Sequence, residues 1–128
     1  SCGTSQLVSS HTQSTGVDSF TNYDIIGVAI DLDNDKVYFT KNGAYQDDPT
    51  PDPDDNDGRA VVSAYNNYWT PWMSKDDTNY ESTVEFNFGN PTFTVSSTQA
   101  DDNGYGSFEY DVPTGYYSLC TKNLAEFG

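Results

Sequence analysis

The chain has 128 residues, a length that suits a single domain. Ten Tyr, seven Phe and two Trp accompany ten Gly and six Pro, which favours an all-β fold of short strands and turns. Twenty acidic residues oppose five basic ones, for a formal charge of −15. This acidity argues against nucleic acid and anionic membranes as partners, because both are negatively charged and would repel the chain. No apolar run approaches the roughly twenty residues of a spanning helix, so membrane insertion is not expected.

The first 23 residues form a weakly patterned N-terminal segment rich in Ser, Thr, Gln and Gly. The chain opens on Ser1 rather than Met, and we expect a fragment or a processed piece of a longer protein. Cys2 and Cys120 lie near opposite ends, and the sequence leaves open whether they pair.

The clearest pattern runs from residue 24 to residue 43. Apolar side chains recur at every second position and therefore fall on one face of a predicted strand: Ile26, Val28, Ile30 and Leu32. The sequence Asp-Asn-Asp at 33–35 is typical of a turn, and a second strand is predicted over 36–41. Asn42-Gly43 is a strong signal for a tight turn at the end of that strand. These residues predict a β-hairpin.

The rest of the chain predicts shorter strands joined by loops. Residues 46–58 are rich in Pro and Asp and indicate an exposed loop, after which a short strand is predicted over 59–65. Residues 82–88 alternate as a strand with one wet face, with Val84, Phe86 and Phe88 pointing inward. Further short strands are predicted over 92–96 and 108–110, and no helix longer than one turn is expected. The predicted fold class is an antiparallel β-sandwich or barrel.

The hairpin also has a recognisable sequence. The stretches DIIGVAIDLD at 24–33 and VYFTKNG at 37–43 resemble the centre of a SPRY domain, a concanavalin-like β-sandwich or jelly roll. Weaker similarity continues through VSA at 62–64 and VEFNFG at 84–89, so the resemblance covers roughly residues 19–96. A SPRY domain has further strands before this hairpin, which implies that the N-terminal strands are missing or are supplied by another chain.

The stretch VPTGYYSLCTKNL at 112–124 is similar to a tail that follows SPRY segments in phage virion structural proteins. The resemblance therefore implies three parts: the weakly patterned segment 1–23, a SPRY-like sandwich over 24–111, and a C-terminal tail over 112–128 that packs on the sandwich. It places the protein in a virion or outside cells. It implies other virion subunits, or a protein or glycan of the host surface, as partners, with homo-oligomerisation or strand complementation as modes of assembly.

One segment has the composition of a binding surface, because it combines aromatic bodies with polar tips in a stretch without strand periodicity. We predict that its aromatic and amide side chains contact the ligand or partner; they are Tyr65, Asn66, Asn67, Tyr68, Trp69 and Trp72. The alternative is that the two Trp side chains cap the core.

Catalytic and metal chemistry have weaker support. His11 is the only histidine and lacks a nucleophile motif, and the four Glu residues do not form a closely spaced pair, so we predict a non-catalytic protein without a cofactor. Loosely bound calcium is the one metal to consider, with weak candidate ligands in the acidic loop: Asp52, Asp54, Asp55 and Asp57. The function predicted is binding or assembly in a phage virion protein. A lectin-like carbohydrate-binding module, a glycan hydrolase and a purely architectural domain are the alternatives.

Overall fold

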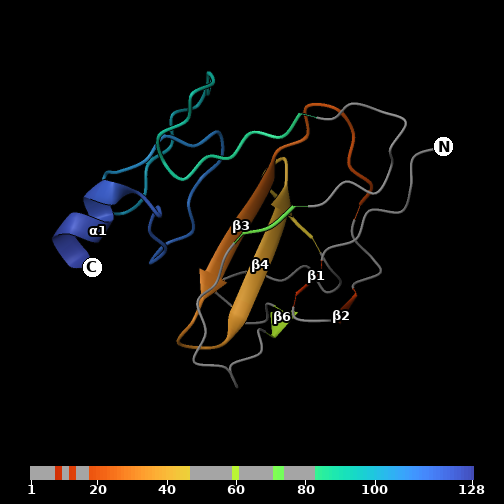
Figure 1. Cartoon of the computed structure of the whole chain (residues 1–128), viewed down its shortest axis with the longest axis horizontal. Helices are drawn as coiled ribbons and strands as arrows, with labels where there is room; N and C mark the ends of the chain where they lie inside the picture. The colour runs from red at the N-terminus through yellow and green to blue at the C-terminus, as the bar shows by residue number, and fades with distance from the viewer. Residues whose placement is uncertain (1–7, 10–11, 14–17, 47–58, 61–70, 74–82) are drawn as a thin grey trace.

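The computed structural model describes residues 8–9, 12–13, 18–46, 59–60, 71–73 and 83–128 (Figure 1). Within these ranges the regular structure consists of antiparallel strands and one short helix. The strands are β1 (Val8–Ser9), β2 (Thr12–Gln13), β3 (Ile26–Asp31), β4 (Lys36–Lys41), β5 (Ala44–Tyr45) and β6 (Arg59–Ala60), and the helix is α1 (Thr121–Phe127). No helix in the described ranges has the length and apolar character needed to cross a membrane.

The strands form one main sheet around the β3–β4 hairpin. Its strand order is β3-β4-β5, and β6 pairs with the other end of β4, while β1 and β2 pair separately. In Figure 1 the C-terminal segment, drawn from teal to blue, lies to one side of this hairpin. The prediction of antiparallel strands is confirmed. The described residues form an antiparallel sheet but do not display the two packed sheets of a sandwich.

The predicted hairpin is confirmed, with β3 and β4 in register from Ile26 opposite Lys41 to Asp31 opposite Lys36. The loop between them is closed by Asp31, whose carboxylate accepts hydrogen bonds from the backbone N of Asp33 and Asn34, both at 3.0 Å. Asp35 adopts a positive φ of 56°, a conformation that aspartate tolerates better than most residues. Asp31 and Asp35 therefore serve the backbone geometry of this turn.

The Asn42-Gly43 turn joins β4 to β5 as predicted. Both residues have positive φ, 50° and 82°, which matches the two-residue turn that suits the twist of a hairpin. The Asn42 side chain also accepts a hydrogen bond from the backbone N of Ile25 and donates one to Asp24, so the turn holds the start of β3 in place.

We expect Gly43→Ala to destabilise the protein by about 1–2 kcal/mol, because an L side chain is strained at this φ. The added Cβ would also lie 2.7 Å from Cδ1 of Tyr110. Gly104→Ala is the matched control, since Gly104 has a φ of 76° but no atom within 4 Å of the added Cβ. Urea unfolding should give a larger loss for Gly43→Ala; equal losses would mean that the Tyr110 contact costs nothing.

Helix α1 corrects the prediction that no helix longer than one turn is present. Cys120 caps its first turn, with Sγ accepting from the backbone N of Asn123 at 3.5 Å, and Gly128 N donates to Leu124 O at the other end. The residues between include Lys, Leu, Ala and Glu, which favour helix. The helix was missed because Cys is not among the usual N-cap residues.

The strands predicted over 82–88, 92–96 and 108–110 do not form in the described residues. Only one isolated bridge is present there, between Gln99 and Phe108. The segment around Asn87 is held differently, because the Asn87 amide donates to Ser107 O at 2.8 Å and accepts from Gly89 N at 2.8 Å. Side-chain hydrogen bonds and turns replace the ladder that the alternating pattern predicted.

A buried carboxylate organises the C-terminal half. Asp101 Oδ1 accepts from the backbone N of Asn103 and Tyr105, at 3.0 and 2.9 Å. Its Oδ2 accepts from Ser118 N and Oγ, both at 2.8 Å, and from Asn123 Nδ2 at 2.7 Å. Two segments of chain, 101–105 and 118–123, therefore meet at one side chain.

The C-terminal segment packs on the face of the main sheet that carries Tyr38. Tyr38 is 1% exposed and meets the ring of Tyr116 edge-on, with centroids 6.3 Å apart. Because Ala29 lies opposite Tyr38 and side chains alternate along a strand, Val28 and Ile30 point to the other face. The tail residue Tyr116 thus packs against Tyr38 of β4, on the face of the sheet that also carries Ala29, whereas Val28 and Ile30 lie on the other face.

Candidate binding surface

The apolar side chains of β3 are exposed, although they have the pattern of a buried strand. Val28 is 57% exposed, Ile30 is 45% and Leu32, just past the strand, is 59%. Val28 and Ile30 share one face with Phe39 and Val37, their partners on β4. Val37 is buried, so the face is covered over β4 and open over β3. We call Val28, Ile30 and Leu32 the β3 surface.

The backbone of β3 is also open along one side, since β4 is its only partner among the described strands. Asn42 N donates to Ile25 O at 2.8 Å, so Ile25 and Asn42 form a hydrogen-bonded pair of the ladder. Antiparallel pairs alternate, and the N–H and C=O groups of Ile26, Val28 and Ile30 are therefore directed away from β4. The bond from Gln46 N to Phe39 O on the far side of β4 agrees with this alternation.

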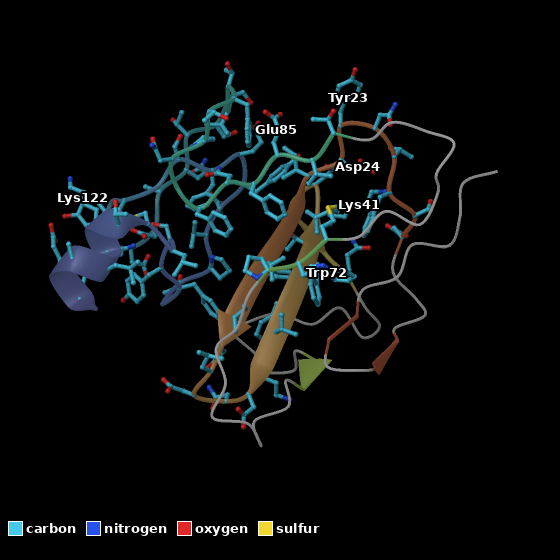
Figure 2. The ribbon with its side chains drawn as sticks, in the orientation of Figure 1. Tyr23, Asp24, Lys41, Trp72, Glu85 and Lys122 are labelled. Atoms are coloured by element: carbon cyan, nitrogen blue, oxygen red, sulfur yellow. The ribbon has the colours of Figure 1, made fainter. Side chains whose placement is uncertain are left out.

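The two ends of the β3 surface differ in charge. At the start of β3, Asp24 lies 3.4 Å from Lys41 Nζ, and hydrogen bonds led by that from Thr21 N lower the Asp24 pKa to about 2. Figure 2 shows Asp24 and Lys41 close together at this end. At the turn, three carboxylates accompany a single cation: Asp31, Asp33, Asp35 and Lys36. The acidic excess therefore lies at the turn end.

A second group of exposed apolar side chains lies on residues 84–88. The rings of Phe86 and Phe88 are nearly parallel, at an interplanar angle of 3° with centroids 6.1 Å apart, and both are exposed, as is Val84. The prediction that these three side chains point inward is therefore wrong. The apolar alternation is present in the sequence, but no described strand pairs with this segment to bury one face.

Of the predicted binding residues, Trp72 is the one that the structure describes. It is 82% exposed, which does not fit a Trp that caps the core, and Figure 2 places it near β4. The other predicted contacts, Tyr65, Asn66, Asn67, Tyr68 and Trp69, lie outside the described residues.

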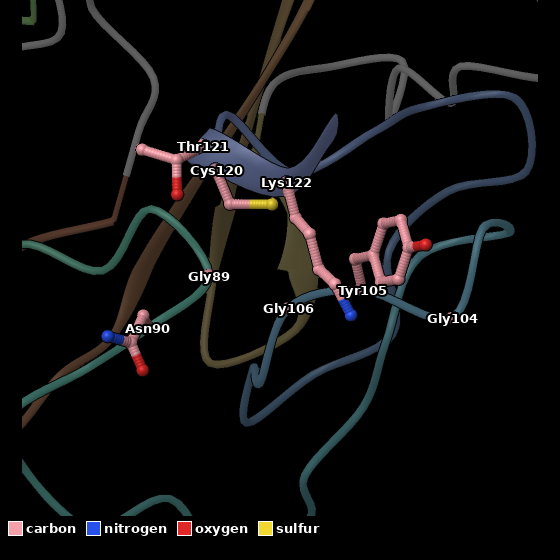
Figure 3. A pocket seen from close by; sticks show the side chains of 8 residues that line it. All are labelled: Gly89, Asn90, Gly104, Tyr105, Gly106, Cys120, Thr121 and Lys122. Carbon is pink, nitrogen blue, oxygen red and sulfur yellow. The ribbon is translucent and has the colours of Figure 1, made fainter. Parts of the chain in front are cut away.

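A depression of about 370 Å³ lies beside helix α1 (Figure 3). Lys122 Nζ is 4.5 Å from the centroid of the Tyr105 ring, and the Tyr105 hydroxyl donates to the Glu126 carboxylate at 2.9 Å. The hydroxyl of Ser118 and the backbone N of Asn123 hold the pKa of the Cys120 thiol below its ordinary value. The polar side chains of Tyr105, Cys120 and Lys122 in the depression therefore all have interactions within the protein.

Most of the residues considered for metal binding or catalysis lie outside the described part of the chain. No three side chains of the metal-ligating types cluster there. The predicted calcium ligands Asp52, Asp54, Asp55 and Asp57 lie outside them, as does His11. Glu109 accepts hydrogen bonds from Ser96, and Glu126 from Tyr105, so these carboxylates have structural partners. Cys120 is a free thiol, and Cys2 is outside the described part.

Sequence reasoning missed two features. The exposure of the β3 surface has no signal in the sequence, because an alternating apolar strand is normally half-buried. The second feature is the set of hydrogen bonds around Asp101, for which the sequence holds one weak signal. Asp101 begins a turn-rich stretch over 101–106, where a carboxylate can cap backbone N–H groups.

Comparisons with models of known families, with curated proteins and with solved structures gave no match.

Proposed function

We propose that this chain is a non-catalytic binding and assembly module of a phage virion protein, with a β-sandwich resembling a SPRY domain that another polypeptide helps to complete. The observation that carries the proposal is the exposure of Val28, Ile30 and Leu32 on a strand whose outer edge is open within the described sheet. Contiguous apolar surface of this kind marks interaction sites in soluble proteins. The proposed partners are other virion subunits or a protein or glycan of the host surface, outside cells.

Two further features support the SPRY-like interpretation. The stretch that resembles the centre of a SPRY domain forms the paired strands and the turn that the motif requires, from Ile26 to Gly43. The tail that resembles phage sequences contributes Tyr116, which packs against Tyr38 of the sheet. The second sheet of the sandwich is part of the proposal.

The β3 surface can be tested with the neutral, polarity-sensitive dye Nile red, because an anionic dye would be repelled by the charge of −15. The folded 128-residue chain should bind the dye, and Val28→Thr with Ile30→Thr should weaken binding by about fivefold, since each change removes exposed apolar area and keeps a β-branched residue. Leu119→Thr is the control, an exposed Leu outside the hairpin. Equal binding by all three proteins would contradict the proposal.

Carbohydrate binding is the second candidate function. The parallel exposed rings of Phe86 and Phe88, together with exposed Trp72, favour it, because aromatic faces stack on sugar rings. Signal on a glycan array that is lost in Phe86→Ala would support this function. Hydrolysis of a host polysaccharide by the purified chain would instead support the hydrolase alternative.

A further inference from the structure

We infer that the partner of the β3 surface is an extended segment of a different polypeptide, which adds to the outer edge of β3 as a strand, alternates apolar and polar residues, and carries Lys or Arg at the end that adjoins the β3–β4 turn. The inference rests on the proposed function, because it names the chemistry of the partner for the same surface.

The strand geometry of the partner follows from the edge of β3 that lies open among the described strands. The outward-directed N–H and C=O groups of Ile26, Val28 and Ile30 are spaced to pair with another extended backbone, whereas a helix satisfies its own backbone groups. A strand in that position would continue the face of the sheet that carries Val28 and Ile30. Apolar residues at every second position would then lie beside them and cover them.

The charge of the partner follows from the ends of β3. At the start of β3, Asp24 is already paired with Lys41. The turn at the other end carries three carboxylates, on Asp31, Asp33 and Asp35, and one cation, on Lys36. These carboxylates would attract Lys or Arg side chains at the end of the added strand that adjoins the turn. A second copy of this chain fits poorly, because each copy carries a formal charge of −15 and the two would repel.

The test is titration of fluorescent peptides of about ten residues with the 128-residue chain at low salt, followed by anisotropy. One peptide alternates Val or Ile with Thr between flanking Lys residues, a second has the same core between Glu residues, and a third has the same composition with apolar residues at helical spacing. The first peptide should bind about tenfold more tightly than either of the others. Equal affinity for the helical-spacing peptide would overturn the strand, and equal affinity for the Glu-flanked peptide would overturn the charge assignment.

Methylation of peptide nitrogens tests the backbone pairing directly. Alternate N–H groups of an added strand point to opposite edges, so N-methyl groups on residues of one parity should abolish binding, and those on the other parity should leave it within about twofold. Loss with both parities or with neither would overturn strand addition.

Two protein variants complete the experiment. Val28→Thr with Ile30→Thr should weaken the Lys-flanked peptide about tenfold, and Leu119→Thr should not. Asp33→Asn with Asp35→Asn should reduce the preference for Lys over Glu flanks to about threefold while leaving the hairpin intact, since Asn also tolerates the positive φ of residue 35. Circular dichroism checks that each variant is folded.

The failure of this inference is distinguishable from failure of the proposed function. Dye binding that depends on Val28 and Ile30 without any peptide preference would overturn the added strand and leave the binding surface standing. Loss of both signals would overturn both, and concentration-dependent dimerisation through Val28 would assign the surface to a second copy instead.

Discussion

Asp101→Asn should destabilise the protein by about 3 kcal/mol, because hydrogen bonds to a buried charged group are among the strongest in proteins. The carboxylate accepts from donors on Asn103, Tyr105, Ser118 and Asn123, and an amide can accept with only one of its two heavy atoms. The NH₂ group of the new amide side chain would face N–H groups that need an acceptor. Urea unfolding measures the loss, and Asp111→Asn, an exposed site with the same change in charge, is the control and should lie within about 0.5 kcal/mol of the natural protein.

Asp101 also makes the free energy of unfolding depend on pH. Burial acts to raise the pKa of Asp101, but the hydrogen bonds from Ser118, Tyr105 and Asn123 outweigh it and hold the pKa well below its ordinary value. A carboxyl group with a depressed pKa in the folded state contributes stability that is fully present above about pH 4 and is lost as the pH falls through the folded pKa. Asp24 acts in the same direction, with a pKa of about 2. Acid unfolding should therefore begin below about pH 4 and be less steep in Asp101→Asn; an unchanged slope would show that Asp101 is not the group that titrates.

Tyr38→Ala should have an effect of similar or larger size, about 3–5 kcal/mol, because it removes a fully buried aromatic ring from the small core. Tyr38 is 1% exposed, and its contact with Tyr116 joins the C-terminal segment to the hairpin. Calorimetry should show a lower melting temperature and a broader transition, since the two parts would be less tightly coupled.

Tyr23→Ala is the matched control for this change. Tyr23 is 98% exposed at the turn before β3, so the same substitution removes no buried area. It should alter the stability by less than about 0.5 kcal/mol. A loss at Tyr38 no greater than that at Tyr23 would mean that the Tyr38–Tyr116 contact does not hold the C-terminal segment on the sheet.

Local chemistry predicted the hairpin well. Alternation from Ile26 to Leu32 specified a strand, and Asn42-Gly43 specified its turn type, because both depend on neighbouring residues and on backbone sterics. The same reasoning failed at 84–88, where alternation was present but no described strand pairs with the segment. Helix α1 was missed because its N-cap is Cys120, whose sulfur makes the capping bond that Ser or Asp usually makes. Of the predicted binding residues, only Trp72 has a described position, so that prediction stays open.

The amino-acid sequence by itself determined the acidity of the chain, the β3–β4 hairpin and its two turns, since each depends on residue type and on contacts within a few positions. Only the tertiary structure decided on which face of that hairpin the C-terminal segment packs. That choice depends on the contact between Tyr116 and Tyr38, which are almost eighty residues apart, and periodicity carries no information about such distant pairings. It also decided that Asp101 collects donors from residues 103 to 123 and that Val28 and Ile30 remain exposed. Whether a side chain is buried depends on which segments pack against it, whereas an alternating sequence shows only that one face of the strand is apolar.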